Sequence, residues 1–333
     1  MKTFRRSIPN AADVSYVGTA AEKLPRTSVP NAYPGASPAF APHTFFDSLG
    51  NVTGGFGVEN IITATAHSTY HSLQTSLSGT MGHGGPGIQA SFTWSKSIDD
   101  TSQVIGGTGS TGAVAQGFPQ NPFDNHPEKG PSSFDVTNKF SLSVAQDLHM
   151  GSVEFLRPMS KNLTGGWELL STSSINSGSP FTVFSGVQQT GAGSNGVDRP
   201  DLIAKPRLSV ARKDRQDYFG AGANNAADFF SIPIHLPGGT GPNQGRFGTL
   251  GRNTFRGPAF YNFDFALIKD TPFGRRKSGA ELVDLQFRSE FFDLFNIVTM
   301  GLPNNILSGS GFGEISKTAG NSRQIQFSLK LIY

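Results

Sequence analysis

The C-terminal segment alternates strictly between apolar and polar side chains, a pattern that few structures accept. Apolar side chains occupy every second position from Ile325 to Tyr333, and polar side chains lie between them as far as Lys330. Successive side chains of a strand point to opposite faces, whereas a helix repeats every 3.6 residues. The segment therefore predicts a strand with one apolar and one polar face.

The same alternation recurs upstream, most clearly from Val283 to Phe291 and from Tyr261 to Leu267. Most of these segments exceed the roughly 5–6 residues of an ordinary globular strand. They reach the roughly 9–11 residues that a tilted strand needs to cross a bilayer. We therefore predict seven strands, near residues 68–81, 87–99, 133–147, 165–178, 259–270, 282–295 and 322–333.

The connections between the predicted strands alternate in length. Outer-membrane barrels join their strands by short periplasmic turns and long extracellular loops. If the C-terminus is periplasmic, every long connection falls on the extracellular side. The shorter connections are near 82–86, 148–164 and 271–281, and the long ones are near 100–132, 179–258 and 296–321.

Residues 1–66 do not show the alternation. Five prolines between residues 25 and 42 argue against a strand there. We interpret 1–66 as an irregular segment rich in Pro and Gly, an extracellular loop of a larger barrel, and 67–333 as the C-terminal barrel strands. Complete bacterial barrels have an even strand number, so either 1–66 hide a strand or the barrel is incomplete, which we favour. The predicted fold is all-β, an antiparallel transmembrane β-barrel segment of about seven strands with long extracellular loops.

Composition excludes several classes of function. The chain has no cysteine, which excludes disulfides, thiolate metal sites and cysteine nucleophiles. The net charge of +3 is spread out and does not indicate a nucleic-acid partner. His67 and His71 share a strand face but lie about 13 Å apart, too far for one metal. We expect no catalytic, cofactor or metal site, and we expect that the chain is not an enzyme.

The polar face of the strand near 282–295 supplies the candidate lumen-facing residues. In a barrel this face borders the water-filled interior. A polar network between strands is the default role, and contact with a ligand is the alternative. The candidates are Asp284, Gln286, Arg288 and Glu290.

Aromatic side chains fall near the ends of the predicted strands, as in the girdles that face the two membrane interfaces. The interface candidates are Trp94, Trp167, Phe291 and Phe295. Asp99 and Asp100, at another strand end, lack the spacing of a calcium loop. We expect them to be solvated at the mouth of a loop.

Several strings resemble the barrel of Oar-like TonB-dependent receptors, over roughly residues 55–333 and in the family's order. The strings are YHSLQ at 70–74, FTWSKSIDD at 92–100, FDV at 134–136, GGWE at 165–168, SGSPFTV at 177–183, LGRNTFRGP at 250–258, FRSEFFDLFN at 287–296 and the ending at 323–333.

This resemblance implies an outer-membrane barrel of about 22 strands, plugged by an N-terminal domain, that takes up an unknown ligand with energy from a coupling protein. The family also carries a carboxypeptidase-regulatory-like domain. We expect the chain to be the last third of such a receptor, without plug, coupling motif or signal peptide, and unable to close a pore alone. Its other expected partners are outer-membrane lipid and the barrel-insertion machinery. The closing strand resembles the insertion signal, with Phe327, Leu329, Leu331 and Tyr333 as its residues.

Two other functions remain open. The first is an envelope structural or adhesion protein that binds a partner through its long loops without transport. The second is a soluble sugar-binding β-sandwich, which the length of the strands and their alternating apolar residues oppose. An upstream reading frame that encodes a plug would separate the receptor from the structural protein.

Overall fold

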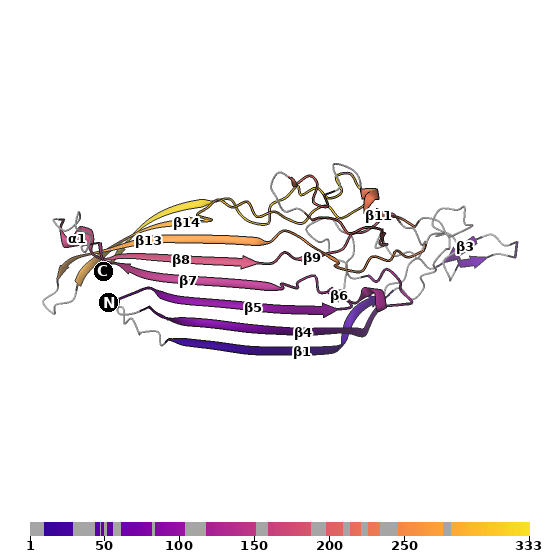
Figure 1. Cartoon of the computed structure of the whole chain (residues 1–333), viewed down its shortest axis with the longest axis horizontal. Coiled ribbons are helices and arrows are strands. Elements are labelled where there is room, and N and C mark those ends of the chain that lie inside the picture. Colours follow the sequence, from indigo (N-terminus) through magenta and orange to yellow (C-terminus); the bar gives the residue numbers. More distant parts are fainter. Residues whose placement is uncertain are drawn as a thin grey trace.

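The computed structural model describes residues 10–28, 44–46, 48–49, 52–55, 61–81, 84–103, 118–150, 159–187, 198–208, 214–220, 226–233, 246–275 and 281–333. Its main feature is one antiparallel sheet whose long strands follow the order β1-β4-β5-β7-β8-β13-β14-β15 (Figure 1). These strands are β1 Ala11–Ser28, β4 Ile61–Thr80, β5 Gly87–Asp99, β7 Asn138–Leu148, β8 Trp167–Asn176, β13 Phe260–Arg275, β14 Glu281–Phe292 and β15 Gln324–Ile332.

Short elements decorate the connections between the long strands. The described helices include none that is long and apolar enough to cross a membrane. The short strands are β2 Thr44–Phe46, β3 Val52–Gly55, β6 Gly130–Pro131, β9 Pro180–Phe181, β10 Asp201–Leu202, β11 Phe230–Ser231 and β12 Phe255–Arg256. The short helices are η2 His126–Glu128, α1 Lys161–Thr164 and η6 Ala226–Asp228.

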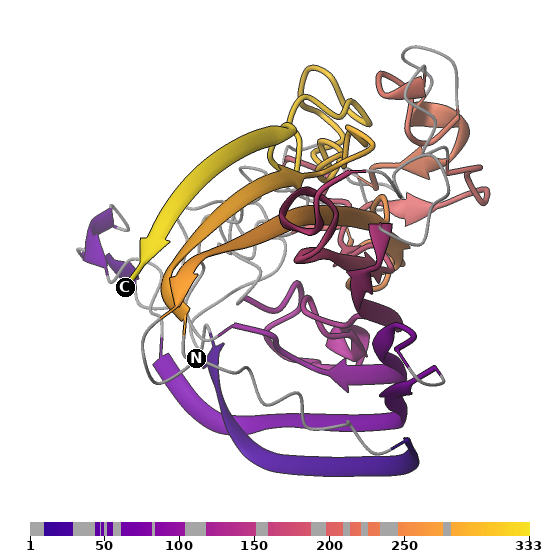
Figure 2. The same cartoon turned by 90° about the vertical axis from the view of Figure 1, so that its left-hand side faces the viewer.

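The sheet is a strongly curved wall that does not close (Figure 2). Strands β1 and β15 form its two edges, and within the described residues they pair only with β4 and β14. Each long strand is antiparallel to the next, so β1 begins at the same end of the wall at which β15 finishes. We call this the inner end, and the end with the long connections the outer end.

All seven predicted strands are present, and the short and long connections alternate as expected. Two observed strand boundaries differ from the predicted ones, because a side chain there accepts a backbone N–H that would otherwise bond to the neighbouring strand. Strand β7 begins at Asn138 rather than near 133, because the carboxylate of Asp135 accepts the Ser97 N–H at 2.6 Å. Strand β14 ends before Asp293, which has a positive φ of 51° and donates its N–H to Asp264 Oδ1 at 3.0 Å.

The prediction of an irregular segment over 1–66 was wrong, because residues 11–28 form an eighth long strand and 61–66 begin β4. The proline at position 25 is tolerated because β1 lies at an edge of the sheet, where a missing N–H breaks no ladder on the open side. The other prolines, from 30 to 42, fall after the strand, outside the described residues. The described part of the chain therefore has an even number of long strands.

Register assigns the side chains of the wall to two faces, because directly paired residues share a face. The apolar face includes Val14, Leu73, Phe92, Leu142, Leu169, Phe265, Phe287 and Leu329, one from each long strand. The polar face includes Ser15, Gln74, Thr93, Ser141, Thr172, Asp264, Gln286 and Lys330.

The apolar face is exposed rather than packed. Val14, Phe327 and Leu329 are 70%, 65% and 68% exposed, and β4, β5, β13 and β14 also carry exposed large hydrophobic side chains, whereas those of β7 and β8 are half-buried. A contiguous exposed apolar surface of this extent indicates contact with lipid or a partner.

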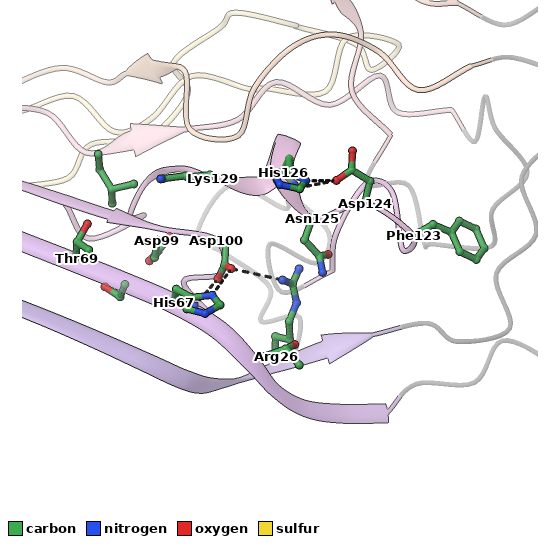
Figure 3. A pocket seen from close by; sticks show the side chains of 13 residues that line it. Arg26, His67, Thr69, Asp99, Asp100, Phe123, Asp124, Asn125, His126 and Lys129 are labelled. Carbon is green, nitrogen blue, oxygen red and sulfur yellow. Dashed lines mark hydrogen bonds and ion pairs between the residues drawn. The ribbon is translucent and has the colours of Figure 1, made fainter.

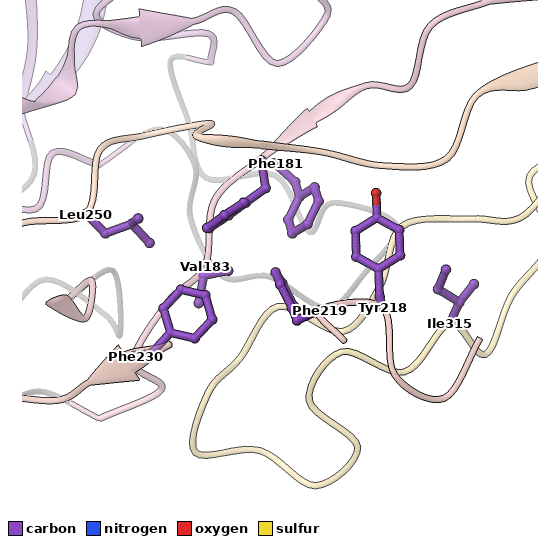
Figure 4. Packing of buried hydrophobic residues seen from close by; sticks show 8 residues of the cluster. Phe181, Val183, Tyr218, Phe219, Phe230, Leu250 and Ile315 are labelled. Atoms are coloured by element: carbon purple, nitrogen blue, oxygen red, sulfur yellow. The ribbon is translucent and has the colours of Figure 1, made fainter. Parts of the chain in front are cut away.

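The hydrophobic core lies among the outer connections, not within the sheet (Figure 4). The ring of Phe219 stacks on Phe312 at 4.8 Å between centroids and meets Phe230 and Phe255 edge to face at 5.5 Å. Such pairs stabilise a core beyond the area that they bury. The buried members are Phe181, Val183, Tyr218, Phe219, Phe230, Leu250, Phe255 and Ile315. The described parts of the 179–258 and 296–321 connections are thus a folded layer.

Candidate functional site at the outer mouth

The loop layer is attached to the wall by arginines that reach carboxylates and carbonyls near the outer ends of the strands. Arg252 forms an ion pair with Asp99 at the end of β5 and donates through Nε to the Glu128 carbonyl at 2.8 Å. Both members of the ion pair are buried. Because a buried charge is costly unless it is paired and hydrogen-bonded, Arg252 fixes the loop against β5.

A second buried pair joins two loops. Arg199 donates to both carboxylate oxygens of Glu128, at 2.8 and 2.9 Å, and each side chain is only 2% exposed. Gln120 completes the group, because its N–H donates to Glu128 and its side-chain oxygen accepts the Arg199 N–H. These hydrogen bonds hold Arg199 against Gln120 and Glu128, although Arg199 is distant from both in sequence.

Arg256 connects the loop layer to the start of β7. Its guanidinium forms an ion pair with Asp135, and its carbonyl accepts the hydroxyl hydrogen of Tyr218. Burial raises the pKa of Tyr218 to about 12, because the anion would lose its hydration. The tyrosine is therefore a neutral donor in the loop core.

The expectation that Asp99 and Asp100 are solvated was wrong. Asp99 is 3% exposed and pairs with Arg252. Asp100 accepts the His67 N–H at 2.9 Å and lies 3.7 Å from Nη1 of Arg26. The loops that fold over the strand ends bury Asp99 and leave Asp100 15% exposed at the cavity.

A cavity of about 510 Å³ lies beside this network, between the outer ends of β1, β4 and β5 and the η2 segment (Figure 3). Strand β1 carries one extra residue near Lys23, whose φ is 58°. Beyond this bulge, Arg26 is 1% exposed and points toward Asp100. A bulge bends its strand, and here it brings the end of β1 against the loop layer.

The cavity presents both signs of charge and an aromatic rim. Its cationic groups include Arg26 and Lys129, and Phe123 projects at its edge with 61% exposure. The backbone N–H and the ring of His126 donate to Asp124 at 3.0 and 2.7 Å and hold the pKa of that carboxyl below its ordinary value. This chemistry suits a small polar ligand that carries charge.

A metal ion does not fit the described part of the mouth. The described residues include no cluster of three His, Asp or Glu side chains that could hold one. The carboxylates of Asp99 and Asp100 point instead to the guanidinium groups of Arg252 and Arg26.

The predicted lumen-facing residues share the polar face of β14. Gln286 donates to Asp270 of β13 at 2.9 Å, and Arg288 pairs with Glu290 at 2.9 Å. Asp284 pairs in register with Pro272 and Ile332. The structure therefore places the four residues on one face, with the Gln286–Asp270 bond between strands. Their roles in a wider polar network and in contact with a ligand stay predictions.

The predicted interface aromatics lie at the two ends of the apolar face. Trp94 pairs with Asn138, the first residue of β7, Phe291 lies near the outer end of β14, and Trp167 begins β8 at the inner end. Phe295 follows β14 and meets Phe263 of the apolar face at 5.4 Å between ring centroids. Their role at a membrane interface stays a prediction.

The predicted insertion signal occupies the edge strand. Phe327, Leu329 and Leu331 of β15 share the apolar face, and Tyr333 follows the strand with 92% exposure. Recognition by the insertion machinery stays a prediction.

Sequence reasoning missed the residues that build the mouth, namely Arg26, Glu128, Arg199, Arg252 and Arg256. Two of them, Arg252 and Arg256, fall within the string LGRNTFRGP at 250–258, which was noted only as a resemblance. The strings FTWSKSIDD at 92–100 and FDV at 134–136 likewise contain the partners of these two arginines, Asp99 and Asp135.

Comparison with known proteins gives one family and one solved structure. A family model described as "Outer membrane beta barrel domain" matches residues 3–326. The outer membrane transporter YddB from Escherichia coli is similar in structure, with a TM-score of 0.39 and 10% identity over 96% of this chain. The chain spans 30% of the length of YddB. No curated protein matches the sequence.

Proposed function

Because the chain belongs to the outer membrane beta-barrel domain family, and so lies in the outer membrane, we propose that it forms the C-terminal part of a TonB-dependent receptor barrel. In this role it would line the path of a ligand whose uptake is energy-coupled. The strings noted in the sequence, which resemble Oar-like receptors, support this assignment.

The observation that carries the proposal is the curved wall with two free edges. Lipid does not tolerate unpaired strand edges, because no water satisfies their N–H and C=O groups. Within the described residues β1 and β15 each pair on one side only, and further strands would satisfy their open sides. A barrel of about 22 strands, the size of plugged outer-membrane transporters, would supply them.

The outer mouth supports uptake of a small, charged ligand. A ligand that arrives from outside meets the exposed Phe123 and the cavity with Arg26 and Lys129 before it reaches the polar face of the wall. The loop layer is held by buried ion pairs, so it presents this cavity in a fixed shape. Preorganised sites lose less entropy on binding.

Partners and chemistry follow from the same proposal. The plug domain would contact the polar face, the energy-coupling protein would act on the plug, and the insertion machinery would assemble the barrel into outer-membrane lipid. We propose no nucleic-acid partner, no cofactor and no catalytic activity, so the chain would bind and pass its ligand unchanged.

The second candidate is an adhesion or structural protein of the envelope. Phe123 and Phe134, 61% and 64% exposed on the outer loops, favour it. Exposed aromatic residues are common at the centre of protein interfaces. Under this alternative, the folded loop layer would bind a partner and nothing would cross the wall.

The decisive experiment compares two deletions in the organism that carries the gene. One strain lacks the whole gene and the other lacks the energy-coupling protein, and both are given labelled iron chelates, cobalamin, short peptides and oligosaccharides. The receptor function predicts that both strains lose uptake of the same class, and that a protonophore abolishes it in wild type. Unchanged uptake of all classes with weakened adherence of the gene deletion would support the alternative.

A pair of substitutions then connects uptake to the cavity. Lys129→Gln removes a lining cation and is expected to raise the half-saturating ligand concentration about fivefold, since one exposed contact is worth about 1 kcal/mol. Lys23→Gln removes an exposed cation outside the cavity and is the matched control. Equal effects of the two changes would place the ligand elsewhere.

A further inference from the structure

A second hollow lies on the wall, separate from the cavity at the mouth. Its volume is about 580 Å³, and side chains of β1, β4 and β5 line it together with Arg256. The residues that matter are Tyr16, His71, Leu73, Trp94 and Lys96. By register, all five belong to the apolar face. Tyr16, Leu73 and Trp94 are level with Asn138, the first residue of β7, and His71 and Lys96 lie one step further toward the outer end.

The side chains that line the hollow change from apolar to basic along the strands. Leu73 pairs with Trp94 at one level, and His71 pairs with Lys96 one step further toward the outer end. Two residues of a strand span about 7 Å. An apolar floor, with Trp94 58% exposed, therefore lies directly below a basic rim.

The basic rim is organised. The hydroxyl of Tyr16 and Nδ1 of His71 share a hydrogen bond of 2.6 Å, and the two rings stack at 6.1 Å with an interplanar angle of 23°. The side chain of Lys96 is exposed, and within the described residues its ammonium has no hydrogen-bond or ion-pair partner. The rim thus holds one oriented imidazole beside one available cation.

Lysines stand toward both ends of this face. Lys96 lies one step beyond Trp94 toward the outer end, and Lys269 pairs with Trp167 near the inner end. Cations at both ends of an apolar band match the phosphates at the two surfaces of a membrane.

We propose that this hollow binds a phosphate-bearing lipid of the outer leaflet, with Lys96 and His71 on the headgroup phosphate and Leu73 and Trp94 against the adjoining hydrocarbon. The proposal rests on the outer-membrane location and not on transport. The lipid would fill the depression in the wall and anchor β1, an edge strand, to its surroundings.

The test uses the complete gene product, reconstituted in phosphatidylcholine vesicles that contain either diphosphorylated lipid A or the same glycolipid without phosphate. Trp167→Phe leaves Trp94 as the reporter, because the tryptophans of the chain are Trp94 and Trp167 and any others in the complete product would be replaced likewise. We expect Trp94 fluorescence to respond to the phosphorylated lipid at lower concentration than to the dephosphorylated one. If Trp94 fluorescence responds equally to the two lipids in the protein with Lys96 and His71 unchanged, the proposal is overturned.

Variants then identify the groups. Lys96→Gln is expected to weaken the response to the phosphorylated lipid about fivefold, because a cation near a membrane surface contributes about a factor of five in binding. Lys139→Gln makes the same change on the polar face of β7, opposite Thr93 of β5, and is the matched control. If Lys139→Gln weakens the response to the phosphorylated lipid as much as Lys96→Gln does, a site on the apolar face is refuted.

Inorganic phosphate separates a lipid site from a free-anion site. We expect phosphate in solution not to displace the lipid at concentrations that leave vesicles intact, since the floor binds hydrocarbon. Displacement by phosphate alone would contradict the lipid as occupant. Uptake measurements are independent of these outcomes, so the transport proposal and the lipid proposal can fail separately.

Discussion

Arg199 and Glu128 form a two-point ion pair that is almost completely removed from solvent, although the residues are 71 positions apart in sequence. The pair lies in the outer loop layer, where Gln120 ties both partners to the neighbouring backbone. Removal of one charge would leave the other buried without a counter-charge, which is far more costly than the loss of an exposed pair.

The first prediction follows from this asymmetry. Glu128→Gln should destabilise the loop layer by about 3–5 kcal/mol, the usual cost of breaking a buried pair. Hydrogen exchange is expected to accelerate at 118–129 and 198–208, while the strands of the wall stay protected. Asp201→Asn is the control, since its partner Arg246 is half exposed, and it should change local stability by about 1 kcal/mol or less. Equal acceleration by both changes would contradict the assigned role of burial.

The second prediction concerns Tyr218, whose pKa burial raises to about 12. The unfolded phenol ionises near pH 10 and the folded one later. The stability that the loop core gains from neutral Tyr218 is therefore complete below pH 10 and is lost as the pH rises toward 12. Absorbance at 295 nm should show one late-titrating tyrosine that Tyr218→Phe removes.

The control for this titration is Tyr333→Phe, which changes a residue that is 92% exposed. That variant should leave the late step in place. A late step that persists in Tyr218→Phe would assign it to another tyrosine and would contradict the burial argument.

The sheet could be predicted from the sequence because its signal is local. Alternation marks β14 and β15 strongly, since large apolar residues occupy every second position from Ile325 to Leu331 and, apart from Ser289, from Val283 to Phe291. The sequence did not predict strand β1, because its apolar face contains small residues such as Ala12, Gly18 and Ala20 and because it contains a proline. Small side chains weaken a period-two pattern even where the backbone forms a full strand.

The outer mouth could not be predicted, because its partners are distant in sequence. Arg252 and Asp99 are 153 positions apart, and no periodic pattern relates them. The same holds for Arg256 and Asp135, at 121 positions. The loop composition correctly indicated turns, but burial of a few aromatic residues and ion pairs decides how those turns fold together.

The third prediction tests the assignment of the two faces on the last strand. Leu329→Arg places a charge on the exposed apolar face, where lipid contact should cost about 2–4 kcal/mol near the middle of the bilayer. Ser328→Arg makes the same addition one residue away on the polar face, opposite Arg288. The folded fraction of the complete product in vesicles, read from heat-modifiable migration on gels, should fall for Leu329→Arg and much less for Ser328→Arg. The reverse order would invert the two faces.

The fourth prediction concerns the depth of the two tryptophans. Trp94 and Trp167 lie on the apolar face near opposite ends of the strands. Indole rings favour the membrane interface, where the apolar ring meets hydrocarbon and the N–H meets water. In this structure the Trp167 N–H donates to the Leu163 carbonyl at 2.8 Å.

In single-tryptophan variants of the vesicle-bound protein, lipids brominated near the headgroup should quench both residues more than lipids brominated near the chain ends. Phe92→Trp, in a background without the native tryptophans, moves the reporter two positions toward the inner end of β5, further into the part of β5 that pairs with β7, so the deep label should quench it relatively more. Deeper quenching for Trp94 than for the Phe92→Trp reporter would mean that the outer membrane surface does not lie at the level of Trp94.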